Sequence, residues 1–130
     1  MAGKTTTHEA TVLNILRATN VTAPANVYVA LFTATPSDAG GGTEVTGNAY
    51  ARQLCGFAAP SGTPRSTVNA ADILFPVQTP GGYGLTSWFA IMDALTSGAM
   101  LYWAPLTVAK TFAAGDQAVF RASQLSVQED

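Results

Sequence analysis

The sequence predicts a mainly β fold, an antiparallel β-sandwich or barrel-like domain with one N-terminal amphipathic helix. Short apolar segments rich in β-branched and aromatic residues recur from about residue 27 onward, as they do in strands. Turn residues separate these segments at intervals of about 8–12 residues, which is typical of sandwiches and barrels. The 130 residues are enough for one domain with its own core. We therefore expect an N-terminal arm over residues 1–6 and a single β-rich domain over 7–130.

The helix is expected over about residues 7–19. Thr6 and Glu9 have the spacing of a capping box, in which Thr6 is the N-cap and Glu9 reaches back to it. Apolar residues then recur at helical spacing, namely Val12, Leu13, Ile15 and Leu16. Asn20 and Pro24 follow and end the helix. We expect the apolar side of this helix to pack against the domain and plug an open face or end of it.

The first half of the domain contains three expected strands. Residues 27–33 are apolar on both faces, which predicts a central strand covered on both sides. A loop with three consecutive glycines follows over 36–43. The second and third strands are expected over 50–57 and 71–77, and Pro76 makes the third an edge strand.

The last third of the sequence has the clearest strand pattern. Residues 85–93 alternate between two faces, one carrying Leu85, Phe89 and Ile91 and the other carrying Trp88, Ala90 and Met92. A turn at 96–98 leads into a strand over 99–106 that 107–112 extends. After a turn at 114–116, a segment over 117–127 closes the chain.

The composition excludes several classes of function. Charged residues are 11% of the chain, well below the usual share of about 25%. The six Lys and Arg residues are scattered, so we expect no nucleic-acid partner. No run of 18 apolar residues is present, which argues against membrane insertion. No apolar stretch follows Lys4, so we expect no signal peptide and folding in a reducing cytoplasm.

Two reactive residue types occur once each. His8 lies in the first turn of the expected helix, where we expect it to be exposed and not preorganised as a catalytic base. Cys55 lies between apolar neighbours, and we expect it to be a small buried hydrophobic residue.

The acidic residues are dispersed along the chain. They are Glu9, Asp38, Glu44, Asp72, Asp93, Asp116, Glu129 and Asp130. A glycosidase needs two carboxylates facing one another, and a calcium loop needs a denser set of ligands than Asp38 and Glu44 supply. The glycines at 40–42 and 81–84 match neither phosphate-loop motif. We expect no catalytic, cofactor-binding or metal-binding residues, and no cofactor.

The aromatic residues leave one alternative open. Tyr83, Trp88, Tyr102 and Trp103 are expected to pack in the core, with the two tryptophans pairing across neighbouring strands. If they are exposed together, they form a platform for sugars. An enzyme or sugar-binding module would need a pocket that holds at least two of Arg52, Asp72, Trp88 and Asp93.

Several segments, in order, resemble a family of small structural proteins of tailed phages. Residues 23–40 read APANVYVALFTATPSDAG, and the segments at 44–52, 69–76, 87–94 and 101–116 are similar to the segments that follow in that family. Two positions depart from the family pattern, because Ser87 replaces a His and Pro105 replaces a Gly. The resemblance covers roughly residues 23–127 and implies a structural protein of the phage virion, since members are described as tail fibre or virion proteins.

The resemblance and the missing catalytic groups lead to two hypotheses. The first is a capsid decoration, or cement, protein that binds the assembled major capsid protein and neighbouring copies of itself as a homo-oligomer. The alternative is a tail fibre or tail-tip component that contacts other tail proteins or the host surface. In both, the protein is not an enzyme and is located in the virion after assembly in the bacterial cytoplasm. The arm over 2–7 and the loop over 40–42 are candidates for ordering on assembly.

Overall fold

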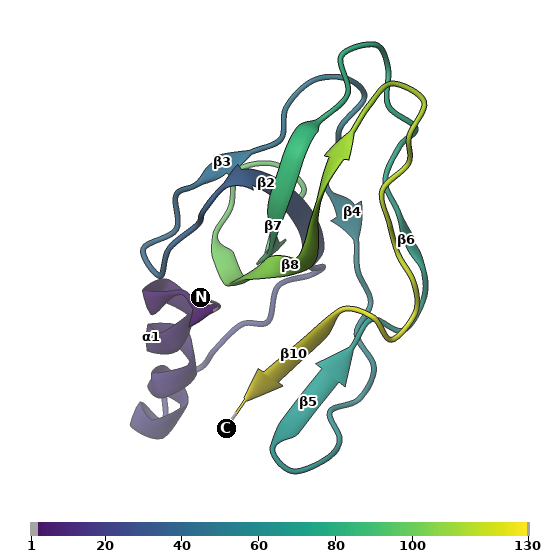
Figure 1. Cartoon of the computed structure of the whole chain (residues 1–130). Helices are drawn as coiled ribbons and strands as arrows, with labels where there is room; N and C mark the ends of the chain where they lie inside the picture. The colour runs from purple at the N-terminus through teal and green to yellow at the C-terminus, as the bar shows by residue number, and fades with distance from the viewer. Residues whose placement is uncertain (1–2, 130) are drawn as a thin grey trace.

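The computed structural model describes residues 3–129 and confirms a mainly β, antiparallel fold with one α-helix near the N-terminus (Figure 1). The elements in chain order are β1 (Gly3–Lys4), α1 (Thr6–Asn14), the 3-10 turn η1 (Ile15–Arg17), β2 (Tyr28–Ala34), β3 (Thr43–Glu44), β4 (Gln53–Leu54), β5 (Arg65–Val68), β6 (Ile73–Leu74), β7 (Gly84–Met92), β8 (Met100–Phe112), β9 (Val119–Phe120) and β10 (Ser126–Glu129).

One large sheet organises the fold. Its strand order is β1-β8-β7-β2-β3, and β4 pairs with the first residues of β2. The long β7–β8 hairpin forms its centre, and the two small sheets β10–β5 and β6–β9 lie to one side of it (Figure 1). Buried residues of the large sheet and of the smaller sheets form one apolar cluster, so the arrangement is sandwich-like.

Strand β2 is buried on both faces, as predicted for residues 27–33. Val29 and Leu31 pack in the core between the sheets, whereas Ala30 and Phe32 pack in a second apolar cluster on the opposite face of the large sheet. The glycine-rich loop between β2 and β3 folds toward this second cluster, where the Asp38 carboxylate accepts a hydrogen bond of 3.1 Å from the indole of Trp103.

Strand β7 shows the predicted alternation except at its start. Phe89 and Ile91 contact the first cluster, and Trp88, Ala90 and Met92 belong to or contact the second. Leu85 was expected beside Phe89 but is 55% exposed. The β7–β8 register shifts between Thr86 and Trp88, and such a bulge reverses the face on which the preceding residues lie. Thr86 is accordingly fully buried in place of Leu85.

The strands outside β2, β7 and β8 are shorter than predicted. Only Gln53–Leu54 of the segment 50–57, and only Ile73–Leu74 of 71–77, form ladder pairs with another strand. The segment 117–127 contains β9 and the first part of β10, with a turn between them. Side-chain hydrogen bonds add to the backbone pairing here, because Gln117 donates to the carbonyl of Phe75 and the Asn69 amide donates to two further carbonyls.

The helix differs from the prediction in its cap and its packing. The N-cap is Thr5 and not Thr6, since the Thr5 hydroxyl accepts from the His8 N–H and donates to the carbonyl of Met100. The helix ends at Asn14 and continues as η1 to Arg17, where Ala18 adopts a left-handed conformation (φ 54°). No residue of α1 or η1 is buried, so the helix does not plug the sheet.

The arm expected over residues 1–6 joins the domain from residue 3 onward. Gly3 and Lys4 pair with Trp103 and Tyr102 at the β8 edge of the large sheet, and Thr5 is buried. Residues 1 and 2 lie outside the described part of the chain. The N-terminal turn of α1 is thus attached to the sheet, whereas its C-terminal turn extends away from it (Figure 1).

Candidate binding surface

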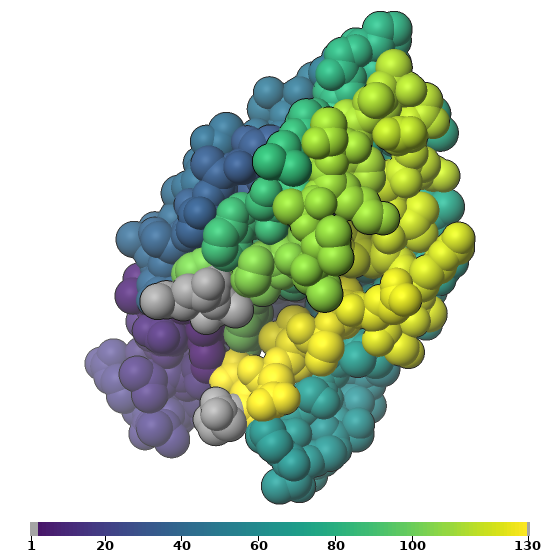
Figure 2. Space-filling model, in the orientation of Figure 1, coloured from purple at the N-terminus to yellow at the C-terminus, as the bar shows by residue number. Residues whose placement is uncertain are grey.

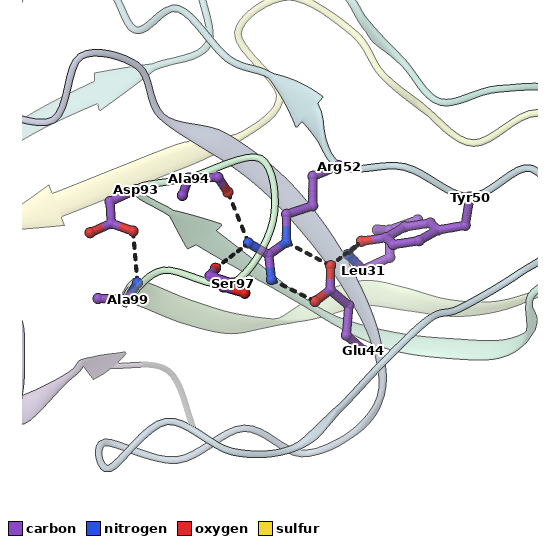
Figure 3. Close-up of polar contacts among 8 residues, drawn as sticks. All are labelled: Leu31, Glu44, Tyr50, Arg52, Asp93, Ala94, Ser97 and Ala99. Atoms are coloured by element: carbon purple, nitrogen blue, oxygen red, sulfur yellow. Dashed lines mark hydrogen bonds and ion pairs between the residues drawn. The ribbon is translucent and has the colours of Figure 1, made fainter.

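The strongest polar cluster joins Glu44, Tyr50 and Arg52 (Figure 3). The Arg52 guanidinium donates to both carboxylate oxygens of Glu44, at 2.8 and 2.7 Å. It also donates to the carbonyls of Ala94 and Ser97 in the turn between β7 and β8. Arg52 therefore connects β3 to that turn, and such a bidentate pair fixes geometry better than a single bond does.

Tyr50 completes this cluster without supplying an accessible acid or base. Its hydroxyl donates to Glu44 and accepts from the Leu31 N–H. Burial raises the pKa of Tyr50 above its ordinary range, and the Glu44 carboxylate adds to the effect. The hydrogen bond from Arg52 to Glu44 raises the pKa of Arg52 further, so its charge is permanent. The arrangement stabilises the fold, and the Tyr50 hydroxyl already both donates and accepts a hydrogen bond within it.

Three of the four residues named for a catalytic or sugar-binding pocket have polar partners within the fold, and the fourth, Trp88, packs against Trp103. Asp72 binds Arg121 at 2.8 Å, and Asp93 accepts from the Ala99 N–H at 2.7 Å within its own turn. Arg52 contacts the same turn, where its guanidinium donates to the backbone carbonyls of Ala94 and Ser97. Within residues 3–129, no group of three or more His, Cys, Asp or Glu side chains could hold a metal ion.

The aromatic residues are packed and do not form a platform. Trp88 and Trp103 contact each other across β7 and β8 with ring centroids 5.8 Å apart, as the sequence indicated. Trp103 and Tyr83 are buried, and Tyr83 packs edge-on against Tyr50. Cys55 is also buried, and this burial raises its pKa to about 11, as expected of a structural thiol.

A second polar cluster lies where the two ends of the domain meet. Lys4 of β1 forms an ion pair of 2.6 Å with Glu129 of β10, and the Tyr102 hydroxyl donates to the same carboxylate. Partial burial opposes ionisation, but these two hydrogen bonds hold the pKa of Glu129 below its usual range. The cluster anchors β10 beside β1.

His8 lies at this cluster and is half-buried, whereas the sequence predicted an exposed residue. Its ring packs edge-on against Tyr102, with centroids 5.0 Å apart. Burial, with a contribution from the Lys4 charge, lowers the pKa of His8. The imidazole is therefore neutral at pH 7 and serves as a packing group at the base of α1.

An apolar cleft opens between α1 and the β5–β10 ladder, at the end of the molecule where Figure 2 shows the purple helix beside the yellow C-terminal strand. Its volume is about 410 Å³, within the range of roughly 300–1,000 Å³ that is usual for binding pockets. The floor consists of apolar side chains from several elements: Val27, Phe57, Ile91, Leu101 and Val127. His8, Tyr102, Glu129 and Arg65 stand at the rim. We call this feature the apolar cleft.

A second apolar feature lies beside it, on the helix. Apolar side chains of α1, η1 and the following segment are exposed, and they are Val12 (38%), Leu13 (59%), Ile15 (61%), Leu16 (83%) and Val21 (37%). We call these five residues the helix patch. The sequence signalled the first four of these by their helical spacing, but not their exposure. The apolar cleft is assembled from residues far apart in the chain and had no local signal.

The comparisons with known proteins decide the family. The family described as podophage GP4 fiber I protein gp80 matches residues 3–128, almost the whole chain. The chain belongs to this family. It is thus a structural protein of a phage virion, as the sequence resemblance implied. A search of the curated proteins gave no match.

The family description bears differently on the two hypotheses. It names a fibre, which favours the tail fibre alternative over capsid decoration. No part of it mentions the major capsid protein, the partner expected first. Within residues 3–129, the structure contains no helix with the length and apolar character of a membrane span.

Proposed function

We propose that this protein is a component of the tail fibre of a podophage, where it attaches to other tail proteins or to the host surface. The observation that carries the proposal is the match of residues 3–128 to a fibre protein family. This replaces capsid decoration, to which the sequence alone gave first place.

The polar side chains support a role in binding and not in catalysis. Each charged cluster within residues 3–129 joins elements of the fold: Arg52 and Glu44 hold the β7–β8 turn, and Lys4 and Glu129 hold the two ends together. A catalytic group needs a perturbed pKa near the working pH together with access to substrate. Tyr50 and Cys55 have pKa values raised away from neutrality, and burial restricts access to both.

Electron microscopy of intact virions carrying a labelled copy tests the proposal. We expect the label on the tail, in a few to a few dozen copies per particle, and we expect antibodies against the protein to reduce adsorption to host cells. Label distributed over the capsid, in hundreds of copies, would refute the fibre assignment and restore capsid decoration. The copy number is measured independently from stained gels of whole virions.

A further inference from the structure

We propose that the helix patch of one copy docks in the apolar cleft of a second copy of this chain. The proposal deepens the fibre function and rests on it only for its biological setting. The association itself is a property of the purified chain.

The first argument is the size of the uncovered surface. The five residues of the helix patch expose on the order of 500 Å² together, backbone included, which is within the 300–600 Å² that is usual for the largest apolar patch of a monomer. A standard interface buries about 800 Å² on each partner. The helix patch and the apolar cleft together would supply the apolar centre of such an interface.

The second argument concerns the helix. Helices shorter than about 12–15 residues are marginal in water and rely on packing of an apolar face. Helix α1 has nine residues, and none of them is buried. Residues 15–26 that follow are all exposed, in a segment with little regular structure. Ordering this segment costs conformational entropy, which burial of Leu13, Ile15 and Leu16 against another molecule would offset.

The third argument identifies the occupant by charge. Among residues 3–129, Glu9 is the one carboxylate whose side chain has no hydrogen bond or ion pair, and it lies in the first turn of α1. Arg65 stands at the rim of the apolar cleft, also without a partner among the described residues. When a helix from a second copy occupies the cleft, its Glu9 can reach Arg65. Each copy thus carries both members of a complementary charge pair, Glu9 on the docking helix and Arg65 at the cleft.

Self-association has few electrostatic obstacles in this chain. The net charge is −2, so two copies repel each other weakly. A surface that carries both the docking element and its receptor can form a closed assembly, either a dimer with reciprocal contacts or a ring. Each copy would then cover the helix patch of a neighbour.

Sedimentation velocity of the purified chain, from about 1 μM to about 1 mM, tests the proposal. We expect wild type to self-associate, and Leu16→Glu to weaken association at least about tenfold by placing a charge in an apolar contact. Leu16 is 83% exposed, so circular dichroism and thermal unfolding of this variant should match wild type. Val108→Glu is the matched control, because Val108 is 66% exposed on β8 and lies outside the proposed contact.

A charge exchange then identifies the contact. Glu9→Arg and Arg65→Glu should each weaken association about tenfold, and the double variant should recover to within about threefold of wild type. A wild-type chain that stays monomeric, a Leu16→Glu variant that associates like Val108→Glu, or a double variant without recovery would each overturn the proposal. If wild type is monomeric but Leu16→Glu is lost from virions, the helix patch binds a different virion protein. None of these results depends on tail location, which the labelled virions report separately.

Discussion

Replacing Asn69 with alanine should remove three buried or half-buried hydrogen bonds that hold the second layer together. Asn69 is fully buried between the strands β5 and β6. Its amide nitrogen donates to the carbonyls of Ala71, at 2.9 Å, and Arg121, at 2.8 Å, and its oxygen accepts from the Leu125 N–H at 2.9 Å. One side chain thus joins two segments about fifty positions apart in the sequence.

The expected cost follows from what each partner loses. Leu125 is 2% exposed, so its N–H would be left buried without an acceptor at a cost of about 1–3 kcal/mol. The carbonyls of Ala71 and Arg121 belong to exposed residues and can turn to water, so each lost bond costs about 0.5–1 kcal/mol. Asn69→Ala should therefore lower the free energy of unfolding by about 2–5 kcal/mol, a large part of the roughly 5–15 kcal/mol that is usual for a domain.

Urea unfolding followed by the fluorescence of Trp88 and Trp103 measures this loss. Asn20→Ala is the control, since Asn20 is exposed and its variant should stay within about 0.5 kcal/mol of wild type. Asn69→Asp preserves shape and the acceptor but turns an oxygen toward two carbonyls, so it should cost at least as much as alanine at neutral pH. A loss below about 1 kcal/mol for Asn69→Ala would show that the three hydrogen bonds do not carry the stability assigned to them.

Three further predictions concern buried or half-buried side chains. Thr86→Val should raise stability by about 1 kcal/mol in urea unfolding, because the Thr86 hydroxyl is buried without a partner and the exchange removes that cost; a lower stability would reveal a missed hydrogen bond. Phe75→Ala should lower it by about 3–5 kcal/mol, since Phe75 is fully buried at the centre of the main core. His8→Gln should reduce the pH dependence of unfolding between about pH 7 and 5. The folded state lowers the His8 pKa below 6.5, so the unfolded chain takes up the proton first and acid destabilises the fold; an unchanged slope would contradict this.

The elements that could be predicted are those whose pattern is local. The alternation of Trp88, Phe89, Ala90, Ile91 and Met92 was enough to place β7 and both of its faces. The doubly apolar segment that became β2 was equally clear, because burial on both sides leaves no polar positions. The turn at Ser97 and Gly98 has positive φ at both residues, which its sequence allows.

The second layer could not be predicted in this way because its strands are two to four residues long. Hydrophobic periodicity needs a longer window. These strands are held by backbone pairing with partners far away in the sequence, and by side-chain hydrogen bonds to distant backbone groups, as at Asn69 and Gln117. No spacing along the chain signals such contacts. The apolar cleft has the same origin, since Val27, Phe57 and Val127 meet only after the layers pack.

The helix marks the limit of sequence reasoning in a different way. An amphipathic pattern shows that one side of a helix will be covered, but it does not show which molecule covers it. The sequence suggested that this domain would supply the cover, and the structure leaves Leu13, Ile15 and Leu16 exposed. In the described part of the chain, nearly every carboxylate is bonded within the fold, and the exception, Glu9, lies on that same helix. Exposed apolar side chains and an unpaired carboxylate thus lie on the same helix. This combination is typical of a binding surface and not of a folded interior.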